Sequence, residues 1–177
     1  KIRDVKPWLD SGYDEASEKE RIVSQQQMNV IHKESLCIMC GCCVSECNSM
    51  ESDPEFFGPA ALAKGFRFVG DPRDQVEVER LERYNDEHGI WDCTRCYFCN
   101  ERCPKGVDPR DAIAKLGAES IRLGIDRDMG AKHANWFVTS AKTMGWLRET
   151  ELVPKTQGVV SSIKEMKFAM GLLKHGK

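Results

Sequence analysis

Residues 37–47 read CIMCGCCVSEC and place five cysteines within one short stretch. A second stretch, CTRCYFCNERC at residues 93–103, repeats the spacing Cys-x2-Cys-x2-Cys-x3-Cys. The two runs together hold all nine cysteines of the chain. The sequence therefore carries one cysteine-rich unit twice.

This spacing is typical of bacterial iron–sulfur ligation. Three thiolates separated by two residues each surround one cubane cluster, and in two-cluster proteins the fourth cysteine binds the other cluster. The pattern predicts two [4Fe–4S] clusters, with a [3Fe–4S] form as the alternative for the second. Their expected ligands are Cys37, Cys40, Cys43 and Cys103 for the first cluster, and Cys47, Cys93, Cys96 and Cys99 for the second.

Cys42 is the one cysteine outside this register, and we expect it to be a buried thiol that binds no cluster. Three cations flank the second run: Arg95, Arg102 and Lys105. Positive charge there would stabilise a reduced, more anionic cluster. Ordinary solvated surface is the alternative reading of all three.

Zinc and disulfides are the chemical alternatives. Zinc sites usually draw paired Cys-x2-Cys knuckles from distant segments, and a secreted disulfide scaffold spreads its cysteines along a small loop-rich chain. Two dense runs fit both poorly, although a zinc-stapled, non-redox interaction module remains the alternative of another class. A cubane whose irons are all bound by cysteine has no open site, so we expect single-electron transfer and no catalytic residues.

The hydrophobic pattern predicts an all-α fold. Helices are expected at 14–32, 59–70, 75–88, 109–124, 136–147 and 159–173, with Asp108 as an N-cap and Pro109 at the first helical position. Val159, Ile163, Met166, Met170 and Leu173 form one apolar stripe on the last helix. We expect this stripe to pack on the domain or to dock on a partner, with the lipid interface as the alternative.

Composition limits the class of protein. The chain has 177 residues, of which 41% are hydrophobic and 31% charged, and its net charge of −2 suggests no nucleic-acid partner. No apolar run reaches the ~18 residues of a membrane-spanning helix, and the N-terminus has no apolar signal core. We expect one compact domain with a second small lobe, and any membrane association to be indirect.

Several strings resemble a known family. GPAALAKGFRFVGDPRD (58–74), DCTRCYFCNERCPKGVDP (92–109) and AIAKL (112–116) resemble the C-terminal helical domain of the iron–sulfur subunit of succinate dehydrogenase and fumarate reductase, and KPWL (6–9) resembles the segment that enters it. The resemblance implies a helical ferredoxin-like domain. We expect a linker and entering helix at 1–32, the dicluster domain at 33–125 and a helical extension at 126–177.

The same resemblance implies a role. The family subunit relays electrons between a flavoprotein subunit, where succinate and fumarate interconvert, and a quinone-side membrane subunit, in the tricarboxylic acid cycle or in anaerobic respiration. This chain would act only as part of that oxidoreductase complex, in the cytoplasm or peripherally on the inner membrane through its partners. The family's [2Fe–2S] cluster lies in an N-terminal domain whose Cys-x4-Cys-x2-Cys signature this sequence lacks, so we expect that domain to be missing from the sequence.

Two departures from the family pattern narrow the resemblance. Most members have an aliphatic residue at the position of Cys96 and bind a [3Fe–4S] cluster there, so Cys96 implies a second [4Fe–4S] cluster. Asn48-Ser49-Met50 replaces the usual proline and tryptophans near the quinone, and Thr94 replaces a common histidine. Both are similar to the branch whose partner is a cysteine-rich, heterodisulfide-reductase-like subunit. A dicluster subunit of a heterodisulfide-reductase-type or anaerobic glycerol-3-phosphate dehydrogenase complex is the alternative.

Overall fold

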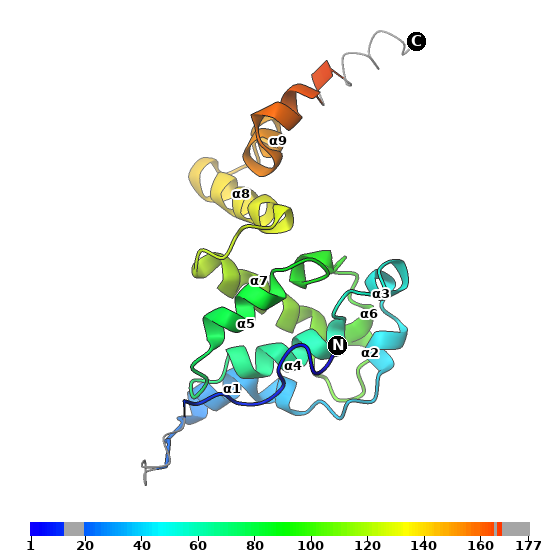
Figure 1. Ribbon diagram of the computed structural model, residues 1–177, viewed down its shortest axis with the longest axis vertical. Coiled ribbons are helices and arrows are strands. Elements are labelled where there is room, and N and C mark those ends of the chain that lie inside the picture. Colours follow the sequence, from blue (N-terminus) through cyan, green and yellow to red (C-terminus); the bar gives the residue numbers. More distant parts are fainter. Residues whose placement is uncertain (13–19, 165, 168–177) are drawn as a thin grey trace. The chain divides into compact units, whose positions relative to one another are not determined.

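The computed structural model describes residues 1–12, 20–164 and 166–167. The chain is helical, and no strand occurs in this described part, so the predicted all-α class is confirmed (Figure 1). The contacts divide the chain into two compact units, Lys1–Ile125 and Asp126–Lys177. The elements of the first unit are α1 (Gln25–Ser35), α2 (Cys42–Ser45), α3 (Asn48–Ser52), α4 (Pro59–Val69), α5 (Glu77–Tyr84), η1 (Ile90–Asp92), α6 (Phe98–Glu101) and α7 (Pro109–Arg122), and those of the second are α8 (Met129–Met144) and α9 (Glu149–Gln157).

Helix α1 is shorter than the predicted segment 14–32, of which residues 14–19 lie outside the described residues. Residues 20–24 are not helical. A capping box sets the start: the Ser24 hydroxyl accepts from the Gln27 backbone N–H at 3.3 Å, and the Gln27 side chain accepts from the Ser24 N–H at 2.9 Å. The prediction missed this signal because it followed the pattern of charged and apolar residues and did not look for capping residues.

Helix α7 begins at Pro109 as predicted, but Asp108 does not cap it. Asp108 has a left-handed backbone with φ of 55° and ψ of 59°, whereas a capping residue normally has extended angles. Its carboxylate instead forms an ion pair with Lys33 of α1. Asp108 thus has the predicted N-cap position, but its side chain makes no capping hydrogen bond and joins two helices instead.

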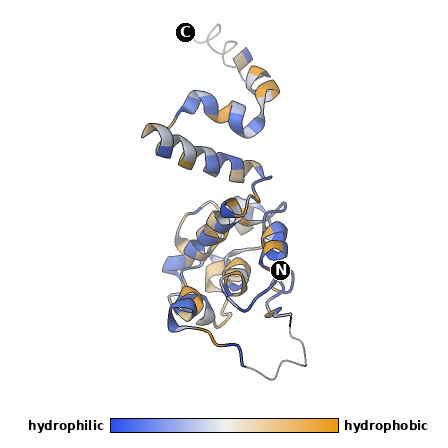
Figure 2. Ribbon diagram, turned by 90° about the vertical axis from the view of Figure 1, so that its left-hand side faces the viewer, coloured by the Kyte–Doolittle hydropathy of each residue, from blue (hydrophilic) through white to orange (hydrophobic). Residues whose placement is uncertain are grey.

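Helix α4 is the centre of the first unit and packs against α1, α5, α7 and α2. Small residues cover much of its surface and let the neighbours approach closely. An added Cβ at Gly65 would lie 2.9 Å from the Tyr84 ring, so α5 packs directly on the glycine. Leu62 and Phe66 fill the space between these contacts and are buried. In Figure 2 the helix in the middle of this unit carries many hydrophobic residues, coloured orange.

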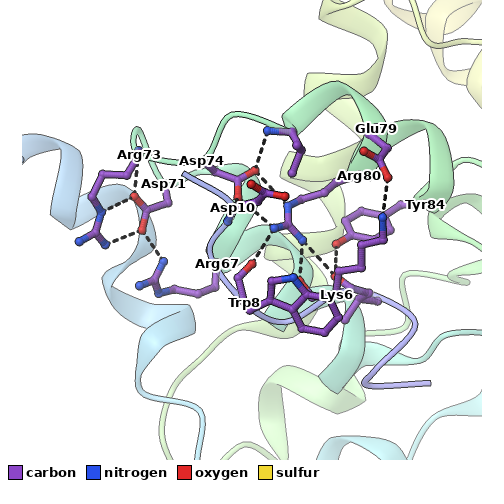
Figure 3. Close-up of polar contacts among 12 residues, drawn as sticks. Lys6, Trp8, Asp10, Arg67, Asp71, Arg73, Asp74, Glu79, Arg80 and Tyr84 are labelled. Atoms are coloured by element: carbon purple, nitrogen blue, oxygen red, sulfur yellow. Dashed lines mark hydrogen bonds and ion pairs between the residues drawn. The ribbon is translucent and has the colours of Figure 1, made fainter. Parts of the chain in front are cut away.

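The N-terminal segment is tied to α5 by a buried arginine (Figure 3). Arg80 is 3% exposed and donates to both carboxylate oxygens of Asp74, at 3.0 and 2.9 Å. The same guanidinium donates to the carbonyls of Lys6 and Trp8, both at 2.6 Å. The Tyr84 hydroxyl donates to the carbonyl of Val5 at 2.7 Å. Residues 5–8, which have no regular structure of their own, are thereby held against the core.

The second unit is a helical hairpin of α8 and α9, which pack together. The buried Ser140 hydroxyl donates to the Trp146 carbonyl at 3.0 Å and accepts from the Arg148 N–H at 2.9 Å, so it closes the turn between the helices. Helical residues follow from 159. The predicted stripe is exposed where it is described, at Val159, Ile163 and Met166, and what it packs or docks on stays a prediction. Met170 and Leu173 lie outside the described residues.

Candidate iron–sulfur centres

The two cysteine runs have the same backbone course. Met39 and Arg95, at equivalent positions, both have left-handed backbones, with φ of 59° and 56°. Gly41 and Tyr97 share the next such position, with φ of 81° and 70°. Each run thus has two left-handed residues, and the second of them directly precedes a four-residue helix, α2 or α6. The repeat in the sequence is therefore also a repeat in structure.

Hydrogen bonds after the loops match as well. The Val44 N–H donates to the Gly41 carbonyl at 2.9 Å, and the Asn100 N–H donates to the Tyr97 carbonyl at 2.9 Å. The fourth cysteine of each run follows the short helix and is bonded to it. The Cys47 N–H donates to the Val44 carbonyl at 3.2 Å, and the Cys103 N–H donates to the Asn100 carbonyl at 3.3 Å. Helices α2 and α6 pack together, so each fourth cysteine comes close to the other run.

The first predicted set of cysteines surrounds a hollow. All four of its members, Cys37, Cys40, Cys43 and Cys103, line the same cavity. The other lining residues are Ile38, Met39, Gly41, Cys42, Ala60, Ala63, Lys105, Val107 and Pro109. The wall is mostly apolar, and α4 forms its floor through the two alanines. Cys103, from the second run, thus faces the cysteines of the first.

Electrostatic contacts between thiols agree with this grouping. The pKa of Cys43 is raised to about 12, first by burial and then by the nearby sulfurs of Cys37, Cys99 and Cys103. Thiolates crowded in this way repel one another, and a thiol bound to a metal centre is deprotonated outright. The site therefore fits a multiply charged cationic group.

The second predicted set is also brought together. Burial raises the pKa of Cys99 to about 11, with further contributions from Cys93, Cys96 and Cys47. Burial likewise raises the pKa of Cys93, and Cys47 and Cys96 add to that effect. Cys47, from the first run, therefore lies among the cysteines of the second. The sulfurs are grouped crosswise, as the spacing predicts for two-cluster proteins.

Backbone donors complete the fit. The Val107 N–H donates to the sulfur of Cys103 at 3.4 Å. The backbone N–H of Arg110 interacts with the sulfur of Cys99 as a hydrogen-bond donor, and this lowers the pKa of that thiol against the larger effect of burial. Amide hydrogen bonds to thiolate sulfur are a common way in which proteins tune iron–sulfur clusters. The donor set thus suits iron–sulfur clusters, although no group of three or more His, Cys, Asp or Glu in the described residues is arranged to hold a metal ion by itself.

Cys42 is not buried, and this part of the prediction is wrong. The residue is exposed, at the first position of α2, where the second run has Phe98. Its backbone N–H hydrogen-bonds to Cys40 and lowers the pKa of that thiol. A bond between the two side chains lowers it further and raises the pKa of Cys42. The helix start directs this side chain outward, and hydrophobic character alone could not show that.

The three predicted cations have different surroundings. Lys105 follows the second run in sequence but lines the hollow of the first set, because Cys103 crosses to it. The charge of Arg95 lowers the pKa of Cys93 against the larger effect of burial. Arg102 is exposed and lies 3.8 Å from Glu46, its equivalent at the end of α2. Of the three cations, Lys105 and Arg95 therefore lie close to the predicted cluster ligands in the fold, whereas Arg102 pairs with Glu46.

Asn48-Ser49-Met50 forms the start of α3. The buried Ser49 hydroxyl accepts from the Thr94 N–H at 3.2 Å, so this helix is joined to the second cysteine loop. At the other end of α3, the Asp53 carboxylate contacts the His88 ring at 2.7 Å. The hydrogen bond to Asp53 raises the pKa of His88. The sequence analysis found neither contact, because each joins residues far apart in the chain.

Within the described residues, no helix has the length and apolar character needed to cross a bilayer.

Comparisons with known proteins agree with the site. Residues 34–107 match the family model described as the 4Fe-4S dicluster domain. The fumarate reductase iron-sulfur subunit of Escherichia coli is 38% identical over 118 residues, 67% of this chain and 48% of the relative. The succinate dehydrogenase iron-sulfur subunit of Coxiella burnetii is 37% identical over 119 residues, 67% of this chain and 50% of the relative.

A third relative matches along nearly the whole chain. The 8-methylmenaquinol:fumarate reductase iron-sulfur subunit of Wolinella succinogenes is 28% identical over 178 residues, 99% of this chain and 55% of the relative. The chain thus spans about half the length of the curated relatives it matches. The predicted [4Fe–4S] cofactors and the predicted resemblance are confirmed. The chain is a relative of the iron–sulfur subunits of fumarate reductase and succinate dehydrogenase, and it carries their 4Fe-4S dicluster domain.

Proposed function

We propose that this chain is the electron-relay part of a succinate/fumarate oxidoreductase, with Cys37, Cys40, Cys43 and Cys103 holding one [4Fe–4S] cluster and Cys47, Cys93, Cys96 and Cys99 the other. The observation that carries the proposal is the crosswise grouping of the thiols: Cys103 lines the hollow of the first run, and Cys47 lies among the sulfurs of the second. Such clusters supply one-electron transfer.

The residues around the cysteines suit that role. The apolar wall and floor of the first hollow limit water at the sulfurs, and Lys105 places a positive charge at its edge. Burial and nearby charge are the main means by which a protein sets the potential of an iron–sulfur cluster. The short helices α2 and α6 pack together, so the two cysteine sets lie side by side, as a relay requires.

Metal and sulfide analysis with EPR tests the cofactors. We expect about eight iron and eight acid-labile sulfide per chain, because two cubanes contain that number. Dithionite reduction of the anaerobic protein should give the spectrum of interacting reduced [4Fe–4S] clusters. Two zinc ions without a cubane signal would contradict the redox function and support a zinc-stapled module.

Cys96 decides the type of the second cluster. With four cysteine ligands, the anaerobically prepared protein should show no [3Fe–4S] signal. In Cys96→Val, the second cluster should lose one iron and give the EPR signal of an oxidised [3Fe–4S] centre, while the first cluster is unchanged. A [3Fe–4S] signal in the unmodified anaerobic protein would contradict ligation by Cys96.

We further propose that the chain passes electrons between a flavoprotein subunit and a quinone-side subunit, and that the latter is of the cysteine-rich kind. Two observations support this branch. The relative named for 8-methylmenaquinol matches 99% of this chain, whereas the Escherichia coli subunit matches 67%. In addition, helix α3, which directly follows Cys47, contains Ser49 and Met50 and no tryptophan.

Two experiments test the partners. After excess dithionite is removed, the reduced clusters should be reoxidised by excess fumarate when a small, substoichiometric amount of the flavoprotein subunit is present, and not by fumarate alone. Mass spectrometry of the native complex should identify a cysteine-rich subunit, and its absorbance should show no haem. A haem-binding membrane anchor in that complex would contradict the proposed branch but not the relay.

A further inference from the structure

Arg110, the second residue of α7, lies against the second cysteine run. Its guanidinium carbon is 4.5 Å from the centre of the Tyr97 ring, and Tyr97 stands between Cys96 and Cys99 in the sequence. One terminal nitrogen forms an ion pair with Asp111 at 2.9 Å. The side chain is 22% exposed, so its charge is partly shielded from water.

Backbone and side-chain bonds hold Arg110 in this place. Its N–H donates to the Asn100 side-chain oxygen at 2.9 Å, and the Asn100 amide donates to Asp111 at 3.1 Å. Asn100 directly follows Cys99, so the first turn of α7 is joined to the helix that carries this cysteine. Cys93, across the loop, also interacts with the Arg110 charge.

Among the described residues, the Nε atom of Arg110 finds no hydrogen-bond acceptor. It is buried and makes no hydrogen bond within the part of the chain that the structure describes. Buried polar groups in proteins are nearly always hydrogen-bonded, so an orphaned donor calls for an explanation. A [4Fe–4S] core bound by the four adjacent thiolates has a net negative charge, so its sulfurs would provide the missing acceptor and would favour the positive charge.

The backbone of Tyr97 gives an independent reason. Its φ of 70° is unfavourable for any residue except glycine, and the first run has Gly41 at the equivalent position. The second run nevertheless has a tyrosine at this strained position. The side chain that causes the strain is the one on which the Arg110 guanidinium stacks, and stacking of a cation on an aromatic face is favourable.

We propose that Arg110 is a tuning residue of the second cluster: its fixed positive charge and free N–H donor, held by Tyr97 and Asp111 beside the second cysteine set, raise the reduction potential of that cluster. The inference rests on the proposed ligand sets. Reduction adds one negative charge, so a nearby cation stabilises the reduced form more than the oxidised form. Lys105 has the corresponding place at the hollow of the first set.

The test is an EPR-monitored redox titration of the full chain with its clusters. Arg110→Gln should lower one of the two midpoint potentials, by about 59 mV if the one-electron equilibrium constant falls tenfold. Arg110→Lys keeps the charge but loses the Nε–H and the planar stacking, so its shift should be smaller. Lys105→Gln should lower the other midpoint, which assigns the two potentials.

A matched control comes from the same helix. Arg122, at the other end of α7, is exposed and pairs with Glu119 and Glu77, so Arg122→Gln removes an equal charge far from the cysteines. It should move neither midpoint. A shift in Arg110→Gln no larger than that in Arg122→Gln would overturn the proposal.

Asp111→Asn gives a second test in the opposite direction. It removes the negative charge that partly neutralises Arg110, so the same midpoint should rise. This variant decides the matter if Arg110→Gln fails to assemble its clusters: an unchanged midpoint in Asp111→Asn would then overturn the inference. Absence of two [4Fe–4S] signals in the unmodified chain would overturn the proposed function instead.

Discussion

Single residues distinguish a thiol beside a cluster from a thiol that holds one. Cys42 and Cys103 both line the first hollow, but Cys42 is exposed at the start of α2, whereas the Val107 N–H donates to the sulfur of Cys103. Under the proposed ligand set only Cys103 binds iron. A hollow with five cysteines thus provides its own internal control.

The first prediction compares these two thiols. Cys42→Ala should keep both clusters, with unchanged iron content and EPR spectrum. The variant loses the side-chain hydrogen bond to Cys40, but under the proposed ligand set the Cys40 thiolate is held by iron and does not need that bond. Cys103→Ala should lose the first cluster and about half of the iron. Equal losses in the two variants would contradict the proposed register.

His88 contributes a pH-dependent ion pair. Its ring contacts Asp53 at 2.7 Å and Glu55 at 3.2 Å, and the hydrogen bond to Asp53 raises its pKa above the ordinary 6.5. A raised folded-state pKa means that the protonated ring stabilises the fold. That stabilisation is fully present below about pH 6.5, the unfolded value, and is lost as the pH rises through the folded-state pKa.

The second prediction follows from this sign. Asparagine tolerates the left-handed backbone that His88 has, with φ of 65°. His88→Asn should therefore lower the unfolding midpoint at about pH 5–6, where histidine is mostly protonated, and have a smaller effect at about pH 8. Asp53→Asn is the matched control and should lower the pKa of His88 in an NMR titration. A His88 pKa unchanged by that substitution would show that Asp53 is not the cause.

At the scale of elements, α4 determines the packing of the first unit. Its residues between Pro59 and Val69 are nearly all buried, and Ala60 and Ala63 form the floor of the first hollow. Stability of this helix and the shape of the cluster site therefore depend on the same side chains. A cavity beside this floor should affect both.

The third prediction concerns Leu62, which is fully buried in α4. Leu62→Ala should lower the free energy of unfolding by about 2–5 kcal/mol, the range for deleting a buried leucine side chain. Val78→Ala, on the exposed side of α5, should change it by less than about 0.5 kcal/mol. Denaturant unfolding of the cluster-loaded chain measures both, and equal effects would contradict the central role of α4.

At the scale of the whole molecule, buried charge ties the N-terminal segment to the first unit. Arg80 and Asp74 have side chains 2% and 0% exposed, and the guanidinium also binds the carbonyls of Lys6 and Trp8. No regular structure holds these residues otherwise. Arg80 thus makes the largest share of the contacts to residues 6–8, and the Tyr84 hydroxyl holds Val5 beside them.

The fourth prediction tests this clasp. Arg80→Met leaves the buried Asp74 carboxylate unpaired, which should cost about 3–5 kcal/mol of stability. Hydrogen exchange at residues 5–8 should rise more than exchange in α4. Arg83→Met, at an exposed arginine of the same helix, should leave both quantities near those of the unmodified chain. Equal exchange in the two variants would show that Arg80 does not hold the segment.

Local signals predicted the elements well where they act within a few residues. Pro59 marked the start of α4 and Pro109 that of α7, because a proline at the first helical position needs no hydrogen-bond donor. The side chains of Asp108 and Cys42 differ from expectation for a common reason: Asp108 makes no capping hydrogen bond, and Cys42 is exposed. The direction of a side chain depends on backbone angles that residue type alone does not determine, and both sit where the chain turns into a helix.

The cysteine spacing by itself determined the repeat and predicted both the cluster type and the crosswise ligand sets, because ligand spacing is a local property of the chain. Only the tertiary structure decided which cations lie beside which cysteines. Lys105 lies at the first set because Cys103 crosses to it, and Arg110 lies beside the second because α7 packs on α6. Contacts of this kind join residues far apart in sequence, so they depend on the folded core and cannot be read from spacing.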